Sequence, residues 1–445
     1  MSDRARGIIV LALILSPAPV VAGPADEVLT LEQAVSMALE GNRGVKNALL
    51  EVSKAEDQLG SSRTQALPSF NVYALQSKTL TDIRVHVPEG AFGDFAATGP
   101  IPPADTEVTT PTGRKTLILG QVAQPLTQLR RVGLGVSVKR ASLEIARQKL
   151  RSQRQSVVND MRRSYYALLQ TQSALEAAEE AIRFLRELDR VVDTRVAQKV
   201  ELPAGGMEVK ARLAKEEYDA LSLRNGLMSE RERLNDLLGR AIDVPFGVSP
   251  VPEVEPYESD LEAARALALS RRPDLEEARQ RRRQAEFDHR IKKWDFVPDI
   301  SLTYTYLALP DVELLPKSVS SAGLLLSWEP FDWGRRRHAL AESRRAVEQS
   351  ENALKEAESL AAIDVGARFR RLQEARALIG ATRLGQEAAR ERLKVTTERY
   401  RQKAALLKDV LEDQDRLAAA DRQVDEALLA AWTARADLER ALGED

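Results

Sequence analysis

The sequence contains no cysteine among its 445 residues, and only 5% of them are aromatic. The absence of cysteine excludes disulfides, thiolate metal sites, a cysteine nucleophile and the lipid-modified cysteine of a bacterial lipoprotein. Charged residues make up 30% of the chain, a composition that favours long helices over a compact enzyme with a large aromatic core. The net charge of -2 gives no polybasic signal, and no nucleic-acid-binding module is visible, so we expect no nucleic-acid partner.

Motifs for catalysis or cofactor binding are also missing. The three histidines, His86, His289 and His338, lie far apart and form neither H-x-x-x-H nor H-E-x-x-H. The sequence has no glycine-rich phosphate loop and no G-x-S-x-G nucleophile motif. We therefore expect no enzymatic activity, no cofactor and no metal site.

Long hydrophobic runs are absent after the N-terminus, so no transmembrane helix is expected in the mature chain. Arg4 and Arg6 precede an apolar run at 8–15, and Ala22 follows small residues, which is the pattern of a cleavable signal peptide over 1–22. The alternative, a membrane anchor, is disfavoured because the apolar run is too short to span about 30 Å of hydrocarbon. If the exported chain crosses a membrane, it must do so with β-strands.

The chain repeats itself. Segments at 31–43 match those at 261–273, an offset of 230 residues, and Pro125 matches Pro330 at an offset of 205. Arg195-Val-Ala-Gln-Lys199 matches Arg399-Tyr-Arg-Gln-Lys403, and Leu238-Gly239 matches Leu442-Gly443, both at an offset of 204. The change of offset places about 25 extra residues between the two strands of the first copy. Chance similarity of two charged helices does not explain the shared prolines and the constant offset.

The repeat defines the predicted domain organisation. The first copy covers 23–240, with strands at 69–80 and 115–127 and long helices over 133–240. A proline-rich extended connector covers 241–258. The second copy covers 259–445, with strands at 299–309 and 321–331 and long helices over 334–443. Each copy opens with one amphipathic helix, at 30–66 and 259–296, that ends at a proline.

The predicted strands alternate apolar and polar residues, most clearly at 300–306. A half-buried soluble sheet and an outer-membrane strand both give this pattern. Residues 81–114 between the first pair are rich in glycine and proline and predict a loop with little regular structure. Four strands cannot close a barrel, and open sheet edges are not tolerated in lipid, so a membrane location would require an oligomer.

The order of these features resembles the TolC family of outer-membrane efflux proteins. The most specific motif is Glu329-Pro-Phe-Asp-Trp-Gly-Arg335, and the resemblance covers essentially the whole mature chain. It implies a mainly α fold with a small β part: a homotrimer whose twelve-stranded outer-membrane β-barrel caps a tunnel of long helices, the α-barrel. It also implies an outer-membrane location with helices extending into the periplasm.

The resemblance implies a function as well. Such proteins are passive, gated exit ducts for efflux or type I secretion, and they dock onto a periplasmic adaptor and an inner-membrane pump. The alternative is a soluble periplasmic coiled-coil scaffold or tether, which has no use for lipid-compatible strands. A membrane-fusion adaptor is a further alternative, but it would contain one helical hairpin where this sequence predicts two.

The resemblance also assigns candidate site residues. The tip turns that contact the adaptor fall on Lys199, Val200 and Leu202 in the first copy and on Lys403, Ala404 and Leu406 in the second. The family usually has glycine at both lysine positions, and the second turn contains no helix breaker.

Candidates for a periplasmic constriction follow from the same resemblance: Asp409, Glu412 and Tyr400. In a trimer the two acids would form a ring of about six carboxylates that favours cations. The usual partners of the tyrosine do not carry over, because Gly205 and Ala405 stand at their positions.

Overall fold

The computed structural model describes residues 28–110, 112–251, 260–311 and 316–444. Helices dominate these ranges and strands form a small part, which confirms the mainly α prediction. The expected signal peptide at 1–22 and the connector beyond residue 251 lie outside the described residues. No described helix is both long and apolar enough to cross a membrane.

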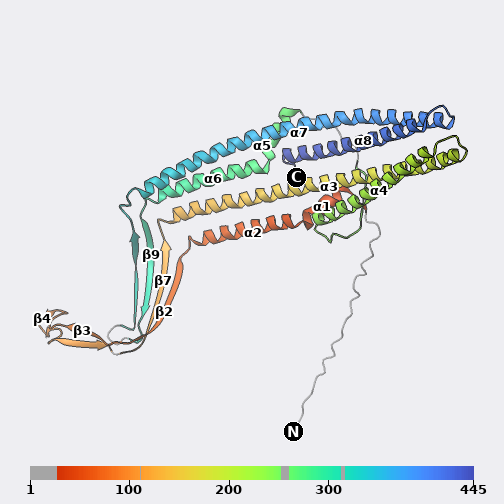
Figure 1. Ribbon diagram of the computed structural model, residues 1–445. Coiled ribbons are helices and arrows are strands. Elements are labelled where there is room, and N and C mark those ends of the chain that lie inside the picture. Colours follow the sequence, from red (N-terminus) through yellow and green to blue (C-terminus); the bar gives the residue numbers. More distant parts are fainter. Residues whose placement is uncertain (1–27, 111, 252–259, 312–315, 445) are drawn as a thin grey trace, which may run out of the picture. The chain divides into compact units, whose positions relative to one another are not determined.

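The chain divides into two compact units, and the described part of unit 1 comprises 28–42, 157–251 and 373–436. It contains β1 (Val28–Leu29), α1 (Leu31–Gly41), α4 (Pro203–Leu238) and β8 (Gly247–Val248). It also contains parts of α3 (Leu129–Ala197), α7 (Arg335–Arg401) and α8 (Leu407–Leu442), shown in Figure 1.

Tyr165 ties the short strands of unit 1 to α3. β1 and β8 pair in parallel, with Val28 opposite Gly247. The fully buried hydroxyl group of Tyr165 lies 2.8 Å from the carbonyl oxygens of both Leu29 and Ser249. The Leu29 and Ser249 carbonyl groups at the end of this strand pair therefore share one polar partner.

Unit 2 comprises the described residues of 43–156, 260–372 and 437–444. Its helices, besides the remaining parts of α3, α7 and α8, are α2 (Arg43–Thr64), α5 (Leu261–Arg271) and α6 (Pro273–Trp294). Its long strands are β2 (Ser69–Thr79), β7 (Gly113–Pro125), β9 (Asp299–Ala308) and β10 (Ser318–Ser327).

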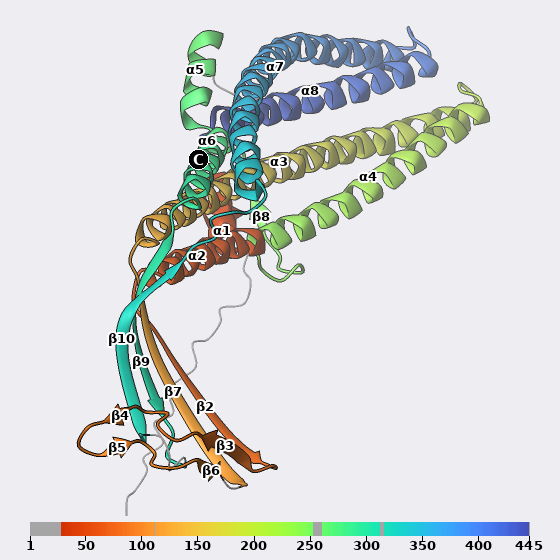
Figure 2. The ribbon, with the colours of Figure 1, turned by 90° about the vertical axis from the view of Figure 1, so that its left-hand side faces the viewer.

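The four long strands form one antiparallel sheet in the order β10-β9-β7-β2 (Figure 2). The two hairpins of the repeat meet at β7 and β9, where Ile118 lies opposite Ala308 and Pro125 opposite Ser301. β2 and β10 are the two edges of this sheet. The sheet is therefore built from one hairpin of each copy.

The strand register gives the sheet two different faces. Residues directly opposite each other share a face, and successive residues alternate. One face, which we call the apolar face, gathers side chains from all four strands: Phe70, Val72, Ile118, Val122, Leu302, Tyr304, Tyr306, Leu324 and Leu326. The opposite face is mixed: it carries polar residues, among them Asn71, Gln121, Ser301, Thr303, Thr305 and Ser321, together with the apolar residues Tyr73, Leu75, Leu117, Leu119, Leu307, Val319 and Leu325.

Three local predictions were wrong. The segment 81–114 contains regular structure: β3 (Ile83–Val87) pairs with β6 (Thr106–Thr110), and β4 (Asp94–Phe95) pairs with β5 (Gly99–Pro100). β10 begins and ends several residues before the predicted 321–331, because its pairing with β9 stops at Ser327 and a turn follows. The third error concerns the opening helices.

Each opening helix is two helices separated by one extended residue. Asn42 has φ −61° and ψ 128°, and Arg272 has φ −62° and ψ 127°. Pro273 explains the second break, since the residue before proline is pushed out of helical geometry. Asn42 has no such neighbour, so the break in the first copy must come from tertiary contacts.

Those contacts repeat in the two copies. In unit 1 the Asn42 side-chain amide donates to the carbonyl oxygen of Leu237 at 3.2 Å, at the end of α4. In unit 2 the Arg272 guanidinium donates to the carbonyl oxygen of Ala441 at 3.2 Å, at the end of α8. The repeat offsets relate both partners, so each break satisfies a carbonyl group that the end of a helix leaves unpaired.

The end of α4 requires glycine. Gly239 has φ 72°, and a β-carbon added there would fall well inside the van der Waals distance of the Gly41 carbonyl group. We expect Gly239→Ala to lower the free energy of unfolding by about 2 kcal/mol or more, because strain and steric overlap add. Thermal unfolding followed by circular dichroism measures the change.

Gly226→Ala is the matched control, because it lies within α4 and its nearest neighbour would be Thr171 Cγ2 at 4.0 Å. It should raise the stability by up to about 1 kcal/mol. Equal unfolding midpoints for the two variants would contradict the close approach of Gly41 and Gly239.

Candidate functional site at the helix tips

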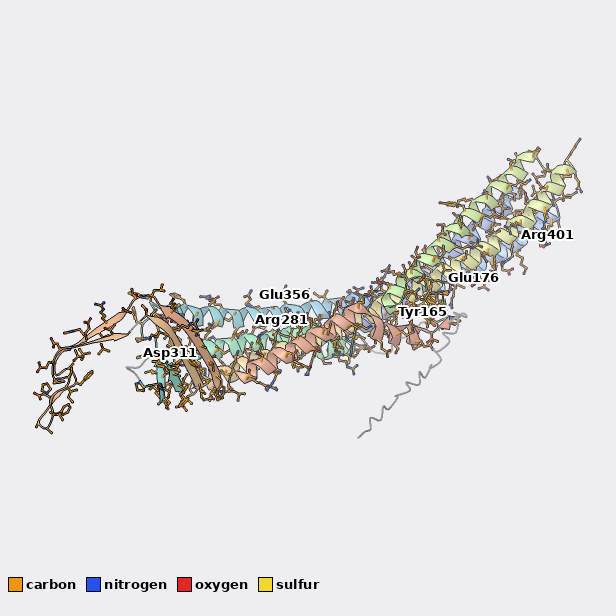
Figure 3. All side chains as sticks on the ribbon, turned by 90° about the horizontal axis from the view of Figure 1, so that it is seen from below. Tyr165, Glu176, Arg281, Asp311, Glu356 and Arg401 are labelled. Atoms are coloured by element: carbon orange, nitrogen blue, oxygen red, sulfur yellow. The ribbon has the colours of Figure 1, made fainter. Side chains whose placement is uncertain are left out.

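Two short turns in unit 1 reverse the long helices, and we call them the tip turns. The first joins the end of α3 at Ala197 to the start of α4 at Pro203. The second joins the end of α7 at Arg401, labelled in Figure 3, to the start of α8 at Leu407. All six residues assigned to the adaptor contact by resemblance lie in these turns.

The first tip turn is built around Lys199, whose φ is 60°. The Lys199 N–H donates to the Val196 carbonyl oxygen at 3.0 Å, and the Val200 N–H donates to the Arg195 carbonyl oxygen at 2.9 Å. This pair of hydrogen bonds is the Schellman ending of a helix, in which glycine is the usual left-handed residue. A lysine there costs roughly 1–2 kcal/mol of backbone strain.

The second tip turn has the same geometry. Lys403 has φ 62°, its N–H donates to the Tyr400 carbonyl oxygen at 3.0 Å, and the Ala404 N–H donates to the Arg399 carbonyl oxygen at 2.7 Å. The turn thus forms at a lysine although 404–406 contains no helix breaker. Both departures from the family's glycine keep the same backbone geometry.

Apolar side chains are exposed at both tips: Val200, Leu202 and Met207 in the first, and Leu406 in the second. Beneath these side chains, the helix pairs α3–α4 and α7–α8 share a hydrophobic cluster. It includes Val192, Val209, Tyr400, Leu407, Val410 and Leu411. Gly205 permits this packing, because a β-carbon there would lie 3.1 Å from Leu407 Cδ2. The tips therefore expose apolar side chains above a buried hydrophobic cluster.

Tyr400 lies inside this cluster. It is only 2% exposed. The Arg195 guanidinium lies 4.1 Å from the centroid of its ring and donates to its carbonyl oxygen at 2.9 Å. The Tyr400 hydroxyl donates to Glu201 Oε2 at 3.4 Å. Burial, opposed in part by the charge of Arg195, raises the pKa of this hydroxyl.

The assignment of Tyr400 to the constriction stays a prediction; within this chain Tyr400 joins the two tip turns. Sequence reasoning missed its partners, Arg195 and Glu201, because both come from the first copy. The only available signal was the match between 195–199 and 399–403, which places Arg195 beside the equivalent turn.

The acids of the proposed constriction differ in their surroundings. Asp409 is exposed at the start of α8, where its carboxylate accepts from the Leu406 N–H at 3.0 Å. Glu412 is half-buried, with Lys408 Nζ at 3.4 Å and Arg416 at 4.0 Å. Both side chains occupy neighbouring positions of one helix face. Among the described residues, no group of three or more potential ligands is arranged to hold a metal ion.

Asp413, which the sequence analysis did not single out, is the buried acid of this region at 3% exposure. It accepts from the Thr396 hydroxyl at 2.7 Å, and Arg392 and Arg416 approach it at 2.8 and 2.7 Å. Burial raises the pKa of this carboxyl, but these hydrogen bonds and charges outweigh burial and hold the pKa below its usual value. Asp413 therefore fixes α8 against α7 as a charged group.

Comparison with known proteins identifies the family. The model of the outer membrane efflux protein family matches residues 34–240 and 264–444, which is most of the chain. The chain belongs to this family, and it is an outer-membrane efflux protein. No curated protein matches it in sequence at a significant level.

Solved structures share its fold. The outer membrane protein VceC from Vibrio cholerae is 17% identical with a TM-score of 0.77, and the match covers 93% of this chain and 96% of that one. CusC is 18% identical with a TM-score of 0.78, covering 93% and 92%. The MtrE outer membrane channel from Neisseria gonorrhoeae, in its open state, is 17% identical with a TM-score of 0.71, covering 93% and 89%.

The strain at the tip lysines can be tested by glycine. We expect Lys199→Gly and Lys403→Gly each to stabilise its turn by about 1 kcal/mol, because glycine adopts the left-handed conformation without a steric cost. Hydrogen exchange at the amides of Val200 and Ala404 should slow about fivefold.

Gln198→Gly is the control, since Gln198 precedes Lys199 and does not have a positive φ. It should speed exchange at the first tip. Faster exchange in the two lysine variants as well would show that the tips do not hold this geometry.

Proposed function

We propose that three copies of this chain form a passive, gated exit duct across the outer membrane and the periplasm. Each copy would contribute four strands to a twelve-stranded barrel, and the long helices would form the wall of the periplasmic tunnel. The tip turns would contact a periplasmic adaptor, and an inner-membrane pump would supply the energy. Family membership and the shared fold support this arrangement.

The exposed apolar face of the sheet carries the proposal. Phe70 and Val72 are both 75% exposed, and Leu324 is 69% exposed. Side chains of this size in one contiguous patch indicate contact with a lipid phase or another protein. In lipid these side chains would avoid the unfavourable contact with water. The more polar face would line a water-filled interior.

The two sheet edges support a closed ring of copies. Successive strands in the order β10-β9-β7-β2 are antiparallel, so β10 and β2 run in opposite directions. Joining β10 of one copy to β2 of the next would therefore continue the antiparallel ladder without a defect. Closure would satisfy the edge N–H and C=O groups, which cannot stay unpaired in hydrocarbon.

The alternative of a soluble periplasmic scaffold is not favoured. A soluble protein with two open edges and an apolar sheet face would aggregate, and natural proteins avoid such surfaces. The second copy's strand pair would also have no role in a coiled-coil tether.

We further propose that Asp409 and Glu412 line the constriction. Their positions on one face near the start of α8 would place about six carboxylates around the pore of a trimer. Lys408 and Arg416 flank Glu412 and would moderate its charge. Asp409, which forms no ion pair with another described residue, would then be the stronger cation ligand.

The membrane-facing side of the sheet can be tested with two adjacent residues. Ala322 lies opposite Tyr304 on the apolar face, and Ser321 lies opposite Thr305 on the other face; both are exposed. We expect Ala322→Arg to cost about 2–4 kcal/mol of membrane insertion and Ser321→Arg to be tolerated. Heat-modifiable trimer in the outer-membrane fraction, scored by gel migration, measures the difference.

Wild-type chain recovered as a soluble monomer would overturn the duct itself. Equal loss of trimer in both variants would show that the faces are not distinguished by lipid.

The constriction is tested by single-channel recording in planar bilayers. Asp409→Ala with Glu412→Ala should weaken the block by divalent cations about tenfold or more, because the carboxylate ring is removed. Glu387→Ala with Glu391→Ala removes the same charge from exposed positions of α7 and should leave the block unchanged. Unchanged block in the first variant would exclude Asp409 and Glu412 from the constriction.

A further inference from the structure

The turn between β10 and α7, within unit 2, holds a tryptophan in a strained conformation. Trp333 has φ 57°, a left-handed geometry that is uncommon for any bulky residue. Its side chain is 87% exposed, and its ring meets Phe331 edge to face with centroids 4.7 Å apart. The backbone is thus strained at a site where the tryptophan ring makes little contact within the protomer.

Asp332 holds this turn in place. Its carboxylate accepts from the Gly334 N–H at 3.1 Å and from the Arg336 N–H at 3.0 Å, at the start of α7. The Arg336 hydrogen bond is the main reason why the pKa of this carboxyl lies below its usual value. Arg336 in turn pairs with Glu329 and Asp332. These contacts hold the turn so that Trp333 points outward. The Arg336 side chain is engaged in the same contacts.

A groove of about 660 Å³ lies nearby, between the C-terminal half of α6 and the first turns of α7. We call it the junction groove. Leu340 and Val347 give it apolar lining, and Lys293, Arg337 and Arg344 give it positive charge, with His289 beside them. The acids Glu348 and Glu351 also line it, but they lie about three to four helical turns beyond Arg337 along α7.

The cations of the junction groove are not neutralised. Within the described part of the chain, no carboxylate is within ion-pair distance of Lys293 or Arg337, whereas neighbouring Lys292 pairs with Asp295 at 3.6 Å. Arg344 forms an ion pair with Glu348 at 3.3 Å on an exposed surface, and such a pair contributes little. The groove therefore offers two free cations and one weakly paired cation at its end near the sheet.

His289 reports the same positive field. Its Nδ1 lies 2.9 Å from the Ser343 hydroxyl oxygen. Burial first, and then the charges of Lys293 and Arg344, lower the pKa of this imidazole. Three cations and the His289 imidazole give the groove the charge and the hydrogen-bonding groups to receive an anion.

We propose that the junction groove binds the phosphate headgroup of an anionic phospholipid, with Trp333 and Phe331 in the membrane interface. Lys293, Arg337 and Arg344 contact the phosphate, and Leu340 and Val347 contact the apolar part of the lipid. This inference rests on the proposed function, because that function places the sheet in the membrane and the junction at its periplasmic surface. An exposed aromatic pair beside unpaired cations matches a lipid better than free phosphate.

Native mass spectrometry of the detergent-purified full chain tests the site. The probes are dioleoylphosphatidylglycerol, dioleoylphosphatidylcholine and inorganic phosphate. The variant Lys293→Gln/Arg337→Gln/Arg344→Gln should bind phosphatidylglycerol at least about tenfold more weakly than wild type. The control Arg283→Gln/Arg345→Gln/Lys355→Gln removes equal charge from exposed positions of the same helices and should bind as wild type does.

Trp333→Gly gives a second readout that a purely structural role would not produce. It relieves the left-handed strain, so we expect a higher unfolding midpoint in detergent together with weaker phosphatidylglycerol binding. A variant that is more stable and binds the lipid as tightly as wild type would overturn the role of the tryptophan.

Three results would overturn the proposal: equal loss in the control variant, equal binding of phosphatidylcholine, or saturation by inorganic phosphate that excludes the lipid. Channel recordings of the same wild-type preparation distinguish a failure of the lipid site from a failure of the proposed function. Conducting channels without preferential phosphatidylglycerol binding would reject the lipid site alone. A preparation that forms no channel would reject the proposed function.

Discussion

Backbone hydrogen bonding at the two edges of the four-stranded sheet is the constraint on which the architecture depends. β2 and β10 each pair on one side only, and the apolar face between them is exposed. In water, the unpaired N–H and C=O groups of the edges would be hydrated, but exposure of the apolar face would be unfavourable. In hydrocarbon, the apolar face would be favourable, but the unpaired edge groups would be costly. Closure with other copies resolves both conflicts at once. The proposed trimer would satisfy the sheet's edges and its apolar face together.

The internal repeat explains how one chain supplies that sheet and two helical hairpins. A hairpin from each copy meets at β7 and β9. In each copy an extended residue, Asn42 or Arg272, ends a short helix and donates to a carbonyl group near the end of a 36-residue helix. The side chains differ, an amide and a guanidinium, yet the hydrogen bond is conserved between the copies. The geometry of this contact was retained while the residue that makes it changed.

The sequence was most informative where one residue type restricts the backbone by itself. Pro298 closely precedes β9, and the self-match located both tip turns. Sequence reasoning failed where contacts with residues far away in the chain determine the local structure. The break at Asn42 depends on Leu237, far away in the chain, and the burial of Tyr400 depends on Arg195 from the other copy. A resemblance carries over a residue's position but not its surroundings, so the partners of Tyr400 could not be predicted.

Backbone strain occurs at both ends of the proposed duct. Among the described residues, three that are not glycine have a positive φ: Lys199, Trp333 and Lys403. Each lies where a long helix begins or ends, and glycine there would remove a cost of roughly 1–2 kcal/mol. Glycine would also remove the side chain. The lysines give the apolar tips a positive charge where the adaptor would bind, and the tryptophan gives the junction an aromatic ring where lipid would lie. Strain at these positions is best explained by contacts that the isolated chain does not make.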